Sequence, residues 1–161
     1  ANNDGQAAIS GLQFSTDLKL PVLSNALLKS RMISSVSQLL DAKLTTEQID
    51  NTDIEGVSEL TANLRLLFNA KKWQSAVNLN YRSDFLEQRD LSNNADVYVD
   101  DFTSVDLSYS WFFSDLVALR FDIFNATDKS LVREVQTNDA SSLMKVEQFG
   151  RRFVLSLSLT L

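Results

Sequence analysis

The chain has 161 residues, of which 44% are hydrophobic and 22% charged, with 15 Lys and Arg against 21 Asp and Glu and with no Cys or His. The missing Cys and His exclude disulfides, thiolate chemistry, the usual zinc sites and Ser-His or Cys-His catalysis. The net charge of −6 argues against general nucleic-acid binding, and no apolar run reaches the ~18 to 20 residues of a transmembrane helix, so any membrane crossing has to be made by strands.

Several segments alternate apolar and polar residues with the two-residue period of a β-strand. In chain order they are about 12–20, then 59–69, 73–85, 103–113, 116–125 and 151–161. In 59–69, for example, one side carries Leu60, Ala62, Leu64, Leu66 and Phe68, and the other carries Thr61, Asn63, Arg65, Leu67 and Asn69. Each segment predicts a strand with one apolar and one polar side.

Segment 26–43 fits two patterns, because its apolar residues lie at helical spacing as readily as at strand spacing. A strand is the preferred interpretation, since the connections then alternate between short and long. The short links are 21–25, 69–72 and 114–115, and the long polar loops are about 42–58, 86–101 and 128–147. Tight periplasmic turns alternate with long extracellular loops in outer-membrane barrels. The sequence therefore predicts an all-β chain, an antiparallel transmembrane β-barrel segment of about seven strands with its carboxy terminus on the periplasmic side of the bacterial outer membrane.

A soluble β-sandwich is the alternative fold for the same alternation. Three features favour the barrel. The segments approach the ~9 to 11 residues of a membrane-crossing strand, where strands of soluble sheets average ~5 or 6. Large aromatic residues gather beside the short turns and predict an interfacial girdle, namely Phe68, Trp73, Trp111 and Phe113. An odd number of antiparallel strands leaves two parallel edges, so further strands from the same polypeptide or another chain are needed for closure.

Several stretches of the chain carry a family resemblance. Residues 99–110 and 119–128, with Asp100-Asp101-Phe102 near the start and Asn125-Ala126-Thr127-Asp128 at the end, resemble the late-barrel hairpin of TonB-dependent outer-membrane receptors. Residues 80–86 are similar to the tyrosine- and arginine-bearing strand before it, 11–15 to an earlier strand opening, and 148–153 with the alternating terminus to the final strand. The chain departs from the family pattern at Leu161, where Phe or Trp is usual, and at Ser156, where Gly is often found.

The resemblance implies that residues 1–161 are the carboxy-terminal strands and extracellular loops of a barrel of about 22 strands with a plugged lumen. The plug domain and the earlier strands would lie outside this sequence. The complete receptor would bind a scarce solute, such as an iron chelate, cobalamin or an oligosaccharide, and import it when the TonB system pulls on the plug. It would be no enzyme and would need no cofactor. A soluble carbohydrate-binding or adhesive β-sandwich and a passive porin-like barrel are the alternative functions.

The polar residues of the predicted strands are the candidate site, because only a lumen can hydrate or pair them in a membrane. The candidates for contact with the plug or the solute are Asn63, Arg65, Asn78, Asn80, Arg82, Asp84, Arg120 and Asp122. Arg82 and Asp84 lie nearest the outer rim and are the first choice for solute contact. The acidic stretch 93–101 lacks the ordered spacing and the Gly of a calcium loop. The sequence therefore predicts no metal site.

Overall fold

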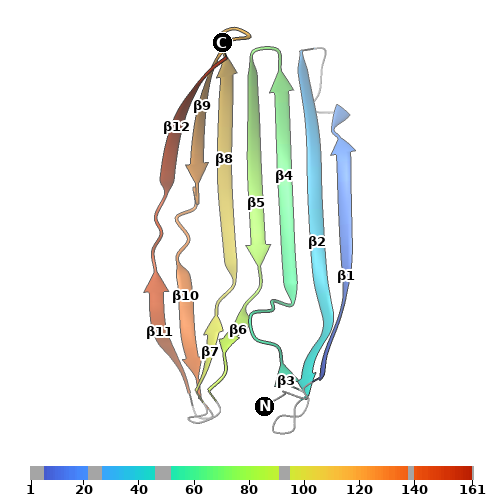
Figure 1. Cartoon of the computed structure of the whole chain (residues 1–161), viewed down its shortest axis with the longest axis vertical. Coiled ribbons are helices and arrows are strands. Elements are labelled where there is room, and N and C mark those ends of the chain that lie inside the picture. The colour runs from blue at the N-terminus through green and yellow to red at the C-terminus, as the bar shows by residue number, and fades with distance from the viewer. Residues whose placement is uncertain (1–5, 22–26, 46–51, 91–94, 138–139, 161) are drawn as a thin grey trace.

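The structure, a computed structural model, describes residues 6–21, 27–45, 52–90, 95–137 and 140–160, with the backbone alone at 6–7, 43–45 and 52–53. Its elements are strands throughout these ranges (Figure 1). They are β1 (Gln6–Lys19), β2 (Leu28–Thr45), β3 (Thr52–Asp53), β4 (Leu60–Ala70), β5 (Trp73–Arg82), β6 (Phe85–Gln88), β7 (Asp96–Val99), β8 (Phe102–Phe112), β9 (Val117–Phe124), β10 (Leu131–Gln136), β11 (Ser141–Glu147) and β12 (Arg152–Leu159). The predicted all-β class is confirmed, and the ambiguous segment 26–43 contributes most of strand β2.

Seven of these strands form one long sheet in the order β1-β2-β4-β5-β8-β9-β12, and the short β3 pairs with β2. Every neighbouring pair along this order is antiparallel. The short connections lie together at one end of the sheet and the long ones at the other (Figure 1). The two edge strands, β1 and β12, consequently run in the same direction.

A second antiparallel sheet, which we call the extension, has the order β11-β10-β7-β6 and lies end to end with the large sheet (Figure 1). Its strands come from 86–101 and 128–147, which were predicted to be long polar loops, so that prediction is wrong for much of both segments. The alternating segments of β6, β7, β10 and β11 are short and contain charged residues, so the sequence does not distinguish them from loops. Segment 73–85 likewise divides, since β5 ends at Arg82 and Phe85 begins β6.

The register of the large sheet joins the apolar sides of its strands into one continuous surface, the apolar face. It consists of even-numbered residues in β2, β4 and the part of β1 that follows the bulge at Ser10 and Gly11, and of odd-numbered residues in β5, β8, β9 and β12. One row across it, for example, contains Leu18, Met32, Leu66, Val77, Leu107, Ile123 and Phe153. From Leu12 in β1 to Leu159 in β12, the apolar face contains no Asp, Glu, Lys or Arg.

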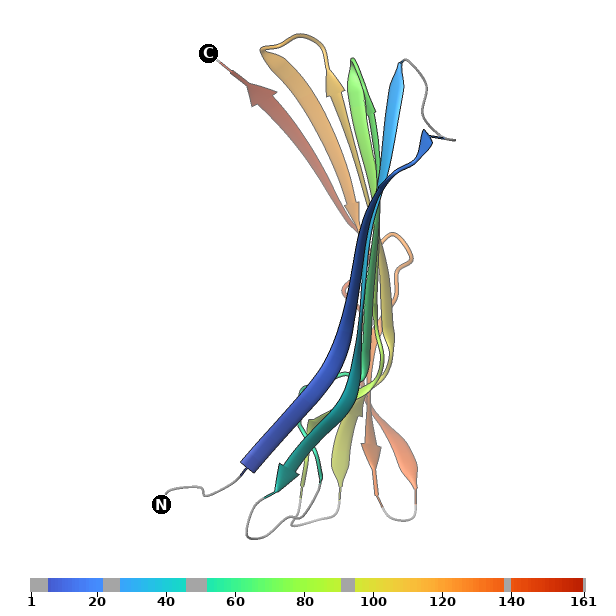
Figure 2. The same ribbon diagram turned by 90° about the vertical axis from the view of Figure 1, so that its right-hand side faces the viewer.

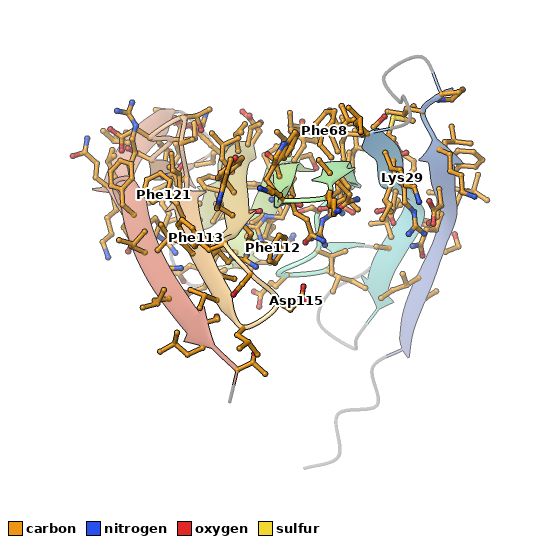
Figure 3. The ribbon with its side chains drawn as sticks, turned by 90° about the horizontal axis from the view of Figure 1, so that it is seen from above. Lys29, Phe68, Phe112, Phe113, Asp115 and Phe121 are labelled. Atoms are coloured by element: carbon orange, nitrogen blue, oxygen red, sulfur yellow. The ribbon has the colours of Figure 1, made fainter. Side chains whose placement is uncertain are left out.

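The other surface, the polar face, collects the alternate residues. A row near its centre contains Ser15, Ser35, Asn63, Asn80 and Ser104, and the next row contains Asp17, Ile33, Arg65, Asn78 and Asp106. The sheet is curved (Figure 2). Phe68 of the apolar face lies on the convex side and Phe112, whose alternation puts it on the polar face, lies on the concave side (Figure 3). The alternation read from sequence thus corresponds to the inside and the outside of an arc.

Very little of the chain is buried, because the large sheet is a single layer. Among the described residues the buried hydrophobic side chains are Ala76, Leu86 and Val99, while Leu155 is 68% exposed. The accessible surface is 11425 Å², whereas a compact monomer of this mass has about 8,100 Å². The described strands do not form two layers packed face to face, which is the arrangement that a β-sandwich requires (Figures 1 and 2).

Candidate binding face

The polar face brings four of the predicted site residues together. Asn63 and Arg65 of β4 lie directly opposite Asn80 and Asn78 of β5. These four residues line a shallow hollow of about 180 Å³, with Ile33 and Ser35 of β2 at its side. Antiparallel pairing explains the cluster, since directly opposed residues point to the same side of a sheet.

The amide side chains of this hollow make only long hydrogen bonds within the sheet. Asn63 Nδ2 donates to Ser35 Oγ at 3.4 Å, and Asn80 Nδ2 donates to Ser104 Oγ at 3.3 Å. Bonds of this length are weak. The amides are therefore able to rearrange toward another partner.

Two other predicted residues, Arg120 and Asp122 of β9, bind each other. Arg120 Nε donates to both carboxylate oxygens of Asp122, at 2.9 and 2.8 Å. Asp122 is buried although Arg120 remains exposed. Asp17 and Arg31, across β1 and β2, form a second ion pair through two hydrogen bonds. Sequence reasoning missed that pair, because its partners are joined only by the strand register.

Arg82 and Asp84 lie where the large sheet passes into the extension. The guanidinium carbon of Arg82 is 4.2 Å from the centroid of the Phe85 ring, which is a cation–π contact. Asp84 is exposed and lines a hollow of about 300 Å³ together with Asp41, Glu59, Tyr98 and apolar residues of β2 and β6. The alternation of apolar and polar residues did not predict this hollow, because its lining residues come from distant parts of the chain.

The predicted aromatic residues lie at the end of the sheet with the short turns. Trp73 and Trp111 are direct cross-strand partners on the apolar face, and Phe68 lies on the same face of β4. Tyr109, which was not among the predicted aromatics, stacks on Trp73 with a centroid distance of 5.9 Å. Phe113 follows the end of β8 and is exposed.

Arg133 is the centre of a charge network in the extension. Its Nε and Nη2 donate to Glu87 of β6 at 2.6 and 3.0 Å, and its Nη1 lies 3.1 Å from Glu147 of β11. Lys145 also contacts Glu147, at 2.5 Å. The hydrogen bonds from Arg133 lower the pKa of Glu87, and the ion pairs with Lys145 and Arg133 lower the pKa of Glu147. The network therefore holds both carboxyls in their charged form.

Two further observations limit the chemistry of the described residues. No three His, Cys, Asp or Glu side chains among them are arranged to hold a metal ion. Residues 93 and 94 of the acidic stretch 93–101 lie outside the described ranges. No helix in the described ranges is long and apolar enough to cross a membrane.

Comparisons with known proteins identify no relative. No protein-family model matches the chain, and neither a curated protein nor a solved structure is similar enough to match it. Its function is therefore argued from the geometry of its two faces.

Proposed function

We propose that the chain forms part of the transmembrane wall of a TonB-dependent receptor in a bacterial outer membrane, with the apolar face toward lipid and the polar face toward the lumen. The observation that carries the proposal is the apolar face, which crosses seven strands without a charged residue and leaves large side chains such as Phe153 and Leu155 exposed. An exposed apolar surface of this extent requires a cover. Lipid is a suitable cover for the apolar face, because charged side chains on the lipid side of a barrel are costly near the bilayer midplane and this face has none.

The dimensions of the strands support the same conclusion. β4 and β8 have 11 residues each and β5 has 10, which matches the ~9 to 11 residues of a tilted strand that crosses the hydrocarbon layer. Trp73, Tyr109 and Trp111 cluster beside the short turns, as aromatic side chains do at a membrane interface. Short turns are periplasmic in such barrels, so β12 would end on the periplasmic side.

The edges of the large sheet support a larger barrel. β1 and β12 each have one neighbour among the described strands and run in the same direction. Backbone groups cannot remain unpaired in lipid. Closure therefore needs additional strands, in keeping with a barrel of about 22 strands that holds a plug. The polar face, including Asn63 and Arg65, would then face the plug or the imported solute.

Single cysteine labels test this assignment, since the chain has no native Cys. Leu64→Cys and Leu155→Cys sample the apolar face, and the matched variants Asn63→Cys and Asn78→Cys sample the polar face. In outer-membrane preparations, nitroxides on the first two sites should be relaxed by oxygen, which concentrates in lipid. Nitroxides at residues 63 and 78 should be relaxed by a water-soluble nickel chelate at least as strongly as by oxygen. Equal access of the chelate to both faces would overturn the proposal.

A further inference from the structure

Charge is unevenly divided over the molecule. The whole chain has a net charge of −6, yet the polar face of the large sheet has an excess of cations among its described residues. Its cations are Lys19, Lys29, Arg31, Arg65, Arg82, Arg120 and Arg152, and its carboxylates are Asp17, Asp106, Asp122 and, toward the carboxyl end of β2, Asp41. Whatever covers this face therefore meets a positive surface.

Three carboxylates of the polar face have partners within the sheet. Asp17 binds Arg31, and Asp122 binds Arg120. Asp106 accepts a hydrogen bond from the backbone N–H of Asn125 at 2.9 Å. Asp17 and Asp122 are therefore paired with cations within the face, whereas Asp106 keeps its charge on β8, two strands away from Arg65.

Arg65 is the cation that stands out by its position. It occupies the middle of β4, between Ile33 of β2 and Asn78 of β5. Within the part of the chain that the structure describes, its side chain has no ion pair and no hydrogen bond. Its neighbours in the hollow of about 180 Å³ are the weakly bonded amides of Asn63, Asn78 and Asn80. A guanidinium flanked by amide donors whose own hydrogen bonds are long is suited to a planar carboxylate, which it can bind through two parallel hydrogen bonds.

We infer that Arg65, with Asn63, Asn78 and Asn80, forms a binding site for a carboxylate supplied from outside this sheet. The inference rests on the proposed function, because Arg65 is removed from bulk water only if the polar face lines the lumen of a barrel. At about 3.4 Å per residue, Arg65 lies roughly 17 Å from either end of β4, and charged groups at that depth are paired. The carboxylate belongs either to a protein segment that fills the lumen or to a small solute.

A zero-length cross-link distinguishes these sources. In Arg65→Lys, the new amine can condense with a carboxylate within salt-bridge reach when the assembled protein is treated with a carbodiimide, and one water is lost per amide formed. We expect a cross-linked peptide if the carboxylate belongs to a protein segment, and a small-molecule adduct on the residue 65 peptide if it belongs to a solute. Either product supports the site and identifies its ligand.

Two controls make a negative result decisive. Arg120→Lys places an amine beside Asp122 and should give an internal amide with that residue, which shows that the reagent reaches the polar face. Native Lys29, on the same face at the end of β2, reports reaction at an open position. If the Arg120→Lys control reacts and Arg65→Lys gives neither product, the carboxylate site is wrong. The nitroxide at Leu64 in the same preparation separates this outcome from failure of the membrane assignment, because it reports lipid contact independently.

Discussion

Asn125 has a structural role at the turn after β9, where the large sheet meets the extension. Its backbone is left-handed, with a φ of 53°. Its Nδ2 donates to the carbonyls of Lys129 and Gly150 at 3.0 and 3.3 Å, and its Oδ1 accepts from the N–H of Lys129 at 3.1 Å. Asn is one of the few residues that adopts this conformation readily and bonds locally. The Asn-Ala-Thr sequence that contributed to the family resemblance therefore holds the junction between the two sheets.

Two substitutions of Asn125 should separate the contribution of its side-chain hydrogen bonds from that of its left-handed backbone. Asn125→Ala loses the side-chain hydrogen bonds and leaves in the left-handed region a residue that tolerates it less well than Asn, so we expect a loss of ~2 to 4 kcal/mol in unfolding free energy. Asn125→Gly loses the bonds but tolerates the backbone, and should cost ~1 kcal/mol less than the alanine variant. Denaturant unfolding in detergent micelles measures both. Equal stability of the two variants would show that the backbone conformation contributes nothing.

Single residues also distinguish the two faces. Leu64→Arg places a charge in the middle of the apolar face and should cost ~2 to 4 kcal/mol and prevent assembly if that face meets lipid near the midplane. Leu157→Arg, in the row of Leu119 and Trp111 beside the short turns, should cost less. Asn78→Gln, on the polar face, should be tolerated. The folded fraction in outer membranes, read from heat-modifiable migration on a gel, measures all three. Equal tolerance of the three substitutions would contradict the assignment of faces.

The extension is the element whose stability should depend on pH. Contacts with Arg133, and for Glu147 also with Lys145, hold the pKa values of Glu87 and Glu147 below the ordinary value of a glutamate. Their contacts with Arg133 therefore stabilise the extension at pH values above the ordinary pKa of a glutamate, and this stability is lost as pH falls through the lowered pKa values. Asp100 acts in the opposite sense, because burial raises its pKa and protonation relieves that cost as pH falls.

Substitution of Arg133 should weaken this acid response. In the native protein, amide protection in β10 and β11, corrected for intrinsic exchange, should fall as the pH drops through the lowered pKa values of Glu87 and Glu147. In Arg133→Gln the protection should be lower already at neutral pH and should change less on acidification. Lys71→Gln, an equal change of charge at the exposed turn between β4 and β5, is the matched control. An unchanged pH dependence in Arg133→Gln would show that the network does not stabilise the extension.

At the scale of the whole molecule, the tryptophans report how the sheet sits in a bilayer. Trp73 and Trp111 are the two tryptophans of the chain, and both lie on the apolar face beside the short turns. In vesicles, lipids brominated near the headgroup should quench their fluorescence more than lipids brominated near the bilayer centre. The double variant Trp73→Phe with Trp111→Phe should remove that component. Strong quenching by aqueous iodide with no effect of brominated lipid would contradict an interfacial position.

The sequence by itself determined the class of element and the division of its residues between two faces. The alternation of Leu64 with Asn63 and Arg65 is a local property, because successive side chains of a strand point to opposite sides. It predicted seven long strands, their antiparallel directions and the alternation of short and long connections. It also grouped Asn63, Arg65, Asn78 and Asn80 as polar residues of neighbouring strands.

Only the tertiary structure decided which of these residues meet. The Asp17–Arg31 pair, the Trp73–Tyr109 stack and the Arg133 network depend on register between strands, and Arg133 and Glu87 are 46 residues apart in the chain. The extension was missed for the same reason. Its short strands contain charged residues, which predict loops when only the sequence is considered. In the structure these charges form ion pairs with residues of neighbouring strands. Cross-strand contacts are set by pairing over long sequence separations, and a two-residue period carries no information about which residues pair.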